Sequence, residues 1–175
     1  LAPSEGILRG TGPFVLLSDE ETNEIIIRNE VAQIMAFDPV GKNSSPSVYP
    51  SSLMGTLSVI RQSILDTNYA IQRIQYENKN QPQTTVDLHL GIQALSRSTS
   101  GKKNIPIWIE PGSCLMNAKA MEIARKFSLG NPVIIATGDE WRNTELSLSR
   151  NNHYILPLLF PAIPDLPNPE DWEQI

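Results

Sequence analysis

The feature that most constrains the fold is an alternation of short apolar runs and amphipathic stretches in the second half of the chain. The apolar runs are "IPIWIE" (Ile105–Glu110), "PVIIAT" (Pro132–Thr137) and "YILPLLF" (Tyr154–Phe160). The first two runs are followed by segments with helical spacing, at about Leu115–Phe127 and Trp141–Ser149. Apolar strands separated by amphipathic helices are typical of a parallel sheet covered on both faces. We therefore predict the α/β class, with a parallel βαβαβ unit that is either half of an open sheet or a sector of a barrel.

The first third of the chain is rich in β-strand signals. "PFVLL" (Pro13–Leu17) and "EIIIRN" (Glu24–Asn29) are short apolar runs bounded by Gly, Ser, Asp and Asn. "VAQIMAF" (Val31–Phe37) fits either a further strand or a short helix, and its periodicity does not decide between them. A Pro/Ser/Gly-rich loop follows at Asp38–Ser52.

Helical spacing begins after this loop. Ser51 or Ser52 can cap a helix, and a polar stretch at Tyr76–Gln83 separates it from a second helix at about Thr85–Arg97. The apolar residues of the first helix are Leu53, Leu57, Ile60, Ile64 and Ile71. We therefore expect a β-rich excursion with a flexible loop at residues 1–48, and the α/β unit at residues 49–175.

Composition excludes several classes of function. The chain has 175 residues and a formal net charge of −5, and it has no cluster of Lys and Arg, which argues against nucleic-acid binding. No stretch reaches the roughly 20 apolar residues of a membrane span. No signal peptide is recognised either, so the compartment stays undetermined. Because the chain opens without Met, we expect a processed product or a piece of a longer protein.

The single cysteine, Cys114, excludes an internal disulfide; it is either a small buried residue or a reactive thiol at a helix start.

Polar residues follow the predicted strands at the edge where parallel α/β folds place their sites. Glu110 ends the first strand, and Thr137-Gly138-Asp139-Glu140 follows the second. Carboxylates on one rim can act as an acid/base pair or hold a divalent cation. Alternatively, Asp139 caps the helix before Trp141, with Glu140 favoured there by the helix dipole. Glu110 is either part of a site or a structural carboxylate with a partner.

Other site chemistries find little support in the sequence. The two histidines, His89 and His153, are not expected to reach Glu110, so the chain alone predicts no His-rich zinc site. Neither phosphate-binding glycine motif occurs, and no serine stands in G-x-S-x-G. Backbone amides at Thr137–Asp139 remain a candidate anion site at a helix start.

Three segments together resemble imidazolonepropionase-like members of the amidohydrolase superfamily. "YPSSLMGTLSVIRQSILDTNY" (Tyr49–Tyr69) is similar to the family's Y-P-S-S-x-M-G stretch, which leads into a helix with an Arg-Gln pair. "GILRGTGPFVLL" (Gly6–Leu17) and "NEIIIRNEVAQIMAF" (Asn23–Phe37) resemble the β-excursion before it, and Asn104–Phe160 resembles the strands and helices that follow it in the family's barrel.

The resemblance implies a metal-dependent TIM-like barrel, of which this chain would be a sector. The family's metal ligands include an HxH pair and a terminal Asp, which would lie outside this chain, and two later histidines. The first of these histidine positions falls on Glu110, and the second falls at about Thr137 or Gly138. Glu110 is thus a candidate replacement metal ligand. A divalent metal, zinc, belongs to the parent family, but this chain alone is not expected to retain it.

The resemblance predicts a fragment of an amidohydrolase that hydrolyses a C–N bond with a metal-activated water, inactive as an isolated chain. Glu110 and Asp139 are the candidate catalytic residues, and Thr137 and Gly138 the candidate anion or substrate contacts. The expected partners are a small-molecule substrate and either the remainder of the barrel or further copies of the chain. Two alternatives stay open: a non-catalytic binding or scaffold module derived from the barrel, and a free-standing α/β binding domain.

Overall fold

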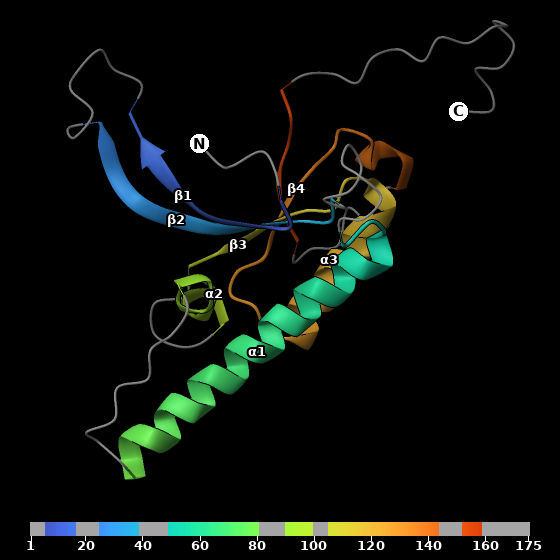
Figure 1. The fold of residues 1–175 in the computed structure, drawn as a ribbon. Helices are drawn as coiled ribbons and strands as arrows, with labels where there is room; N and C mark the ends of the chain where they lie inside the picture. The colour runs from blue at the N-terminus through green and yellow to red at the C-terminus, as the bar shows by residue number, and fades with distance from the viewer. Residues whose placement is uncertain are drawn as a thin grey trace, which may run out of the picture.

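The structure is a computed structural model, and it describes residues 6–16, 25–38, 49–80, 90–99, 105–143 and 152–158. In these residues five strands form one sheet, in the order in which they follow along the chain (Figure 1). The strands are β1 (Leu8–Val15), β2 (Ile26–Ala36), β3 (Ile107–Glu110), β4 (Val133–Ile135) and β5 (His153–Ile155). β1 pairs with β2 antiparallel, whereas β2, β3, β4 and β5 pair parallel to one another. The predicted α/β class and the parallel direction of the three later strands are confirmed.

β2 contains two apolar segments that the sequence analysis treated as separate elements. The run at Val31–Phe37 continues the strand that begins at Ile26, so it is a strand and not a helix. Its last residues, Gln33–Ala36, pair with β3 and are buried whichever face of the sheet they point to, which explains why this half is almost wholly apolar. β2 therefore belongs both to the N-terminal hairpin and to the parallel sheet. The boundary expected between residues 48 and 49 stays a prediction.

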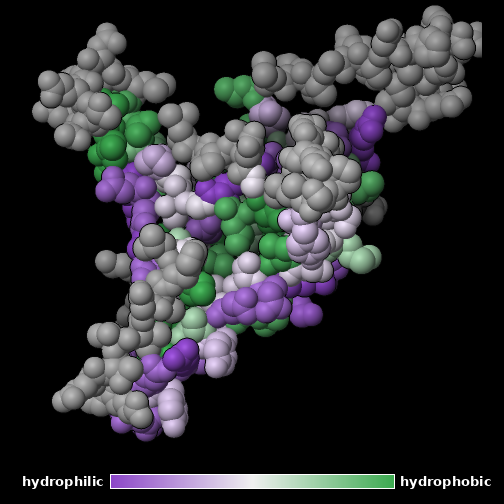
Figure 2. Space-filling model, in the orientation of Figure 1, coloured by the Kyte–Doolittle hydropathy of each residue, from purple (hydrophilic) through white to green (hydrophobic). Residues whose placement is uncertain are grey.

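The outer half of the hairpin projects beyond the parallel part of the sheet (Figure 1). Its end carries apolar side chains that are 39–59% exposed, and they form a green area at the tip in Figure 2. These side chains are Phe14, Leu16, Ile26 and Ile27. We call these four residues the hairpin tip.

In the part of the chain that the structure describes, three α-helices cover one face of the sheet (Figure 1). They are α1 (Leu53–Asn80), α2 (Leu90–Thr99) and α3 (Cys114–Lys126). One buried cluster contains side chains from all three helices together with Met35, Ile107 and Ile109. Ile107 and Ile109 stand two positions apart on β3, so they point to the same side of the sheet. The sequence predicted cover on both faces, but the described helices pack on one.

The boundaries of the helices follow local signals. Ser52 Oγ accepts a hydrogen bond from Gly55 N at 3.2 Å, which confirms the predicted cap at the start of α1. α1 then continues through the polar stretch that was expected to end it, as far as Asn80. An exposed i,i+4 ion pair, Arg73 to Glu77, lies in this last part and favours the helix there.

Some expectations differ in detail or fall outside the described residues. The helix expected at 141–149 appears as a 3₁₀ turn, η2 (Glu140–Asn143), and residues 144–149 lie outside the described ranges. His89, residues 85–89 of the second predicted helix and the loop at 39–48 also lie outside them. No helix in the described part of the chain is both long enough and apolar enough to cross a membrane.

Candidate functional site

The carboxyl ends of β2, β3 and β4 meet at one edge of the sheet. Ala36 pairs with Glu110, and Ile109 pairs with Ile134, so the loops that leave these strands start side by side. A hydrogen bond of 3.5 Å from Cys114 N to Asp139 Oδ2 joins the loop after β3 to the loop after β4. The structure therefore brings Glu110 and the 137–140 loop to a common rim.

Glu110 points away from the helices. Its neighbours Ile107 and Ile109 lie in the helix-covered core, so strand alternation directs Trp108 and Glu110 to the opposite face. Glu110 is also the partner of Ala36, whose small side chain leaves room above the sheet on that face.

Arg9, from the edge strand β1, crosses over β2 to reach Glu110. Its Nη1 donates to Glu110 Oε2 at 2.5 Å, and its Nε donates to Gly6 O at 3.1 Å. The side chain of Arg9 is only 8% exposed, whereas that of Glu110 is 38% exposed. Because a buried guanidinium needs a counter-charge, the pair ties the edge strand to the rim.

A cavity of about 400 Å³ opens beside this ion pair. It lies between the ends of β2 and β3 and the starts of α1 and α3. Its lining consists of Ala36, Phe37, Asp38, Leu53, Glu110, Pro111, Gly112, Ser113 and Met116. Gly112 has a φ of +80°, which lets the chain turn sharply from Glu110 into α3. Two carboxylates and an apolar wall thus share one small cavity, and we call it the rim cavity.

Asp139 is held by hydrogen bonds from two loops. Its carboxylate accepts from Thr137 Oγ1 and from Cys114 N. Partial burial by itself would raise the pKa of Asp139, but these hydrogen bonds stabilise the carboxylate and bring the pKa below its ordinary value. The side chain therefore caps α3, not the turn before Trp141, while Ser113 at the N-cap position makes no side-chain capping bond.

The backbone amides proposed as an anion site already have an acceptor. Thr137 N donates to Glu140 Oε1 and Gly138 N donates to Glu140 Oε2, both at 2.9 Å. An external anion at Thr137 and Gly138 would have to displace this carboxylate.

Cys114 is 4% exposed at the first turn of α3. Burial raises the pKa of its thiol, and the nearby Asp139 carboxylate raises it further. Of the two alternatives for Cys114, a small buried residue and a reactive thiol, this environment favours the buried residue, because a reactive cysteine needs a lowered pKa.

The rim carboxylates already have hydrogen-bond or ion-pair partners within the chain. Glu110 is paired with a buried guanidinium. The Asp139 carboxylate accepts hydrogen bonds from Cys114 and Thr137, and the Glu140 carboxylate accepts one from Gly138 of its own loop. His153 starts β5 opposite Val133, at the other end of the strands from Glu110. Among the residues that the structure describes, no group of three or more His, Cys, Asp or Glu side chains could hold a metal ion.

Sequence reasoning missed Arg9. The signal available was weak: a single arginine in "ILRG", more than 100 positions from the carboxylate that it meets. Only the pairing of β1 with β2, and of β2 with β3, brings the two together.

Comparisons with known proteins add one similarity of fold. A scan against protein-family models gives no match, and a search of curated proteins gives no match either. Among solved structures, the chain is similar to the crystal structure of an amidohydrolase from Thermotoga maritima MSB8, with a TM-score of 0.74 and 17% sequence identity. The similarity covers 90% of this chain and 40% of that chain. The chain thus has an amidohydrolase-like α/β fold and spans about two fifths of that protein's length.

Proposed function

We propose that this chain is a sector of an imidazolonepropionase-like amidohydrolase barrel, and that its rim cavity forms one wall of a small-molecule site. The similarity of fold supports the proposal, as does the placement of all three helices on one face of a parallel sheet. In a barrel the helices lie on the outside, and the carboxyl ends of the strands meet at one mouth. The observation that carries the proposal is Glu110, which stands at the carboxyl end of β3 and lines the rim cavity there.

In the parent protein the reaction is the hydrolysis of a C–N bond. The contribution of this chain is to bind and orient the substrate: Glu110 offers a fixed carboxylate to a substrate N–H, and Phe37, Leu53 and Met116 offer apolar contacts. Arg9 keeps that carboxylate in place. The metal-activated water expected from the resemblance has no ligands among these residues, so we propose that the chain alone binds without turnover.

A second candidate is a non-catalytic binding or scaffold module with the same fold. One observation favours it: the carboxylates of Glu110, Asp139 and Glu140 are all engaged by donors of the protein itself. Both candidates share the binding of a small molecule at the rim, and they differ in whether the parent protein carries out chemistry.

The test is to titrate the full chain with linear amides, lactams and cyclic ureides. Trp108 is half-buried and lies two residues from Glu110 on the same face, so its fluorescence reports on the rim cavity. We expect a saturable signal that Trp108→Phe removes and Glu110→Gln weakens. Glu122→Gln, at an exposed position of α3, is the matched control and leaves binding unchanged.

Two results would overturn the proposal. If none of these compounds binds saturably, the rim cavity is not a small-molecule site. Turnover by the chain alone, together with one tightly bound zinc per chain that depends on Glu110, would show that the rim is a complete metal centre. Zinc content measured by elemental analysis separates this second result from trace contamination.

A further inference from the structure

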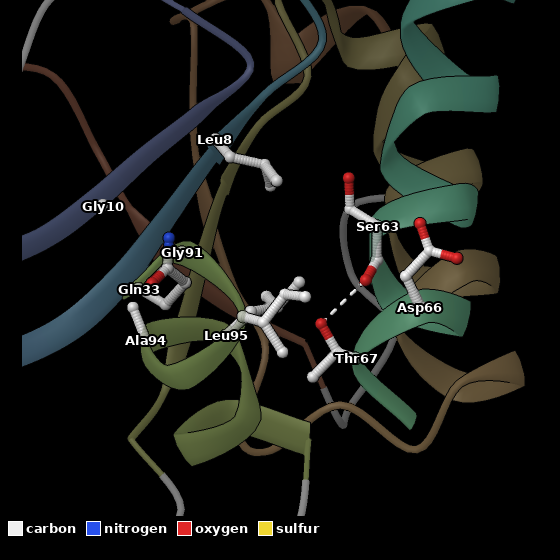
Figure 3. Close-up of a pocket in the computed structure, with 10 residues that line it drawn as sticks. Leu8, Gly10, Gln33, Ser63, Asp66, Thr67, Gly91, Ala94 and Leu95 are labelled. Carbon is white, nitrogen blue, oxygen red and sulfur yellow. Dashed lines mark hydrogen bonds between the residues drawn. The ribbon is translucent and has the colours of Figure 1, made fainter. Parts of the chain in front are cut away.

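A second cavity lies on the helix-covered side of the sheet, away from the rim. It has a volume of about 300 Å³ and lies between β1, β2, α1 and α2 (Figure 3). Its lining consists of Leu8, Gly10, Gln33, Ser63, Asp66, Thr67, Gly91, Ile92, Ala94 and Leu95. Gln33 pairs with Ile107, the first residue of β3, so this cavity adjoins the amino ends of the parallel strands, whereas Glu110 stands at the carboxyl end. We call it the helix-side cavity.

The walls of the helix-side cavity are largely aliphatic. Leu8 from β1, Leu95 from α2 and Thr67 from α1 face the same hollow (Figure 3). Ile92 and Ala94 line it from α2. A wall of this kind favours the apolar body of a small ligand over ordered water.

Gln33 presents an unsatisfied acceptor. The residue is 3% exposed, and its Nε2 donates to Ile34 O at 3.4 Å. Its Oε1 is buried and has no hydrogen-bond partner in the described part of the chain. A buried carbonyl oxygen without a donor is costly, so Gln33 favours a ligand that brings an N–H or O–H group.

Two other polar side chains of the cavity, Thr67 and Asp66, also offer acceptor oxygens. Thr67 is fully buried and donates its only hydroxyl proton to Ser63 O at 2.7 Å, as the dashed line in Figure 3 shows, so its oxygen is left to accept. Asp66 is exposed at the edge of the cavity, where its Oδ1 accepts a hydrogen bond from Gln62 Nε2 at 2.7 Å and its carboxylate keeps further acceptor capacity. Within the described residues, no Lys, Arg or His lines the cavity.

We propose that the helix-side cavity binds a small primary amine in its ammonium form. An ammonium group has three donors and no acceptor, which complements the oxygens of Gln33 and Thr67 and the charge of Asp66. The apolar part of the amine packs against Leu8 and Leu95. This site is independent of the rim cavity and of any reaction there.

The test compares three probes that share one ring and differ in the donor: benzylamine, benzyl alcohol and toluene. Each is titrated into the full chain and followed by NMR shifts of the labelled leucine and isoleucine methyl groups. We expect benzylamine to bind most tightly and toluene most weakly, with several-fold differences in Kd at each step, because each step removes donors or charge.

Three variants assign the preference to residues. Gln33→Leu keeps the volume of the side chain but removes the unsatisfied oxygen, so it reduces the advantage of the amine and the alcohol over toluene without lowering Tm. Thr67→Val has the same effect through the second acceptor, which keeps the test decisive if one variant folds poorly. Asp66→Asn weakens benzylamine alone, and Glu122→Gln on α3 is the control for a general loss of negative charge.

Equal affinities of the three probes would overturn the proposal. A preference for the donor-bearing probes that survives both Gln33→Leu and Thr67→Val would also overturn it. So would the absence of any shift at the leucine and isoleucine methyl groups, which would mean that the cavity holds water only.

Discussion

Arg9 and Glu110 are 101 positions apart in the sequence, yet Arg9 Nη1 lies 2.5 Å from Glu110 Oε2, across the intervening strand β2. A carboxylate at the mouth of a parallel strand is expected in a site of chemistry. Here its counter-charge is a nearly buried guanidinium of the edge strand. Glu110 therefore lines the rim cavity and also pairs with Arg9 of β1, so the binding that we propose at the rim would depend on the same side chain that anchors β1.

Asp139 predicts a specific dependence of stability on pH. Its pKa is lowered in the folded chain because hydrogen bonds from Thr137 and Cys114 outweigh the effect of burial. A lowered folded-state pKa means that the stabilisation is present above the unfolded value, near 3.9, and is lost as the pH falls through the folded value. We expect Asp139→Asn to lose less stability than the wild type between pH 5 and pH 3, by less than about 1 kcal/mol after solvent screening. Urea unfolding at each pH measures the difference, and identical acid limbs would contradict the assignment.

Cys114 is predicted to react slowly. Its thiol is 4% exposed and its pKa is raised, so the thiolate is both rare and covered at pH 8. We expect iodoacetamide to alkylate the folded chain at least about tenfold more slowly than the same chain in urea. Equal rates under the two conditions would show that the start of α3 is open to solvent.

Gly55 stands where the general rule for helix glycines fails. Replacing a helix glycine by alanine ordinarily gains up to about 1 kcal/mol. At Gly55 an added Cβ would lie 2.9 Å from the Cβ of Pro50, and overpacking costs about 1–3 kcal/mol. We expect Gly55→Ala to lower the free energy of unfolding, measured in urea, whereas Ser58→Ala on the exposed side of α1 changes it by less than about 0.5 kcal/mol. A stabilised Gly55→Ala variant would mean that α1 starts differently.

The hairpin tip predicts self-association. Phe14, Leu16, Ile26 and Ile27 are exposed at the end of a two-stranded ribbon, and exposed apolar strands favour contact with another chain. We expect sedimentation velocity to show species larger than a monomer at micromolar concentration, and Ile27→Lys to shift them toward the monomer. A monodisperse wild-type monomer would count against this role of the tip.

Local patterns predicted much of the fold. The apolar runs at β3 and β4 and the apolar spacing of α3 reflect burial against neighbouring elements, so the sequence indicates them directly. Glu110 and Asp139 were predicted to share one rim because parallel strands end at the same edge, and the bond from Cys114 N to Asp139 agrees with it.

Long-range partners were beyond the sequence. Nothing local to Arg9 indicates that it reaches Glu110, 101 positions away. The contact of Glu140 with the Thr137 amide is local, but the residue types alone do not distinguish it from a free carboxylate at the turn. The length of α1 was underestimated because its last turns are polar and exposed, so they carry no amphipathic signal. Helices were predicted on both faces of the sheet because an apolar strand indicates that it is buried, but does not indicate which elements bury it.

The most direct test of the account is a double-mutant cycle of Arg9→Met and Glu110→Gln, measured by urea unfolding of the full chain. If the two side chains form the ion pair that fixes the rim, each single variant is destabilised and the coupling energy is about 1–3 kcal/mol, reduced from a fully buried pair because Glu110 is partly exposed. A coupling energy within about 0.3 kcal/mol of zero would mean that Arg9 does not hold Glu110, and would contradict the account.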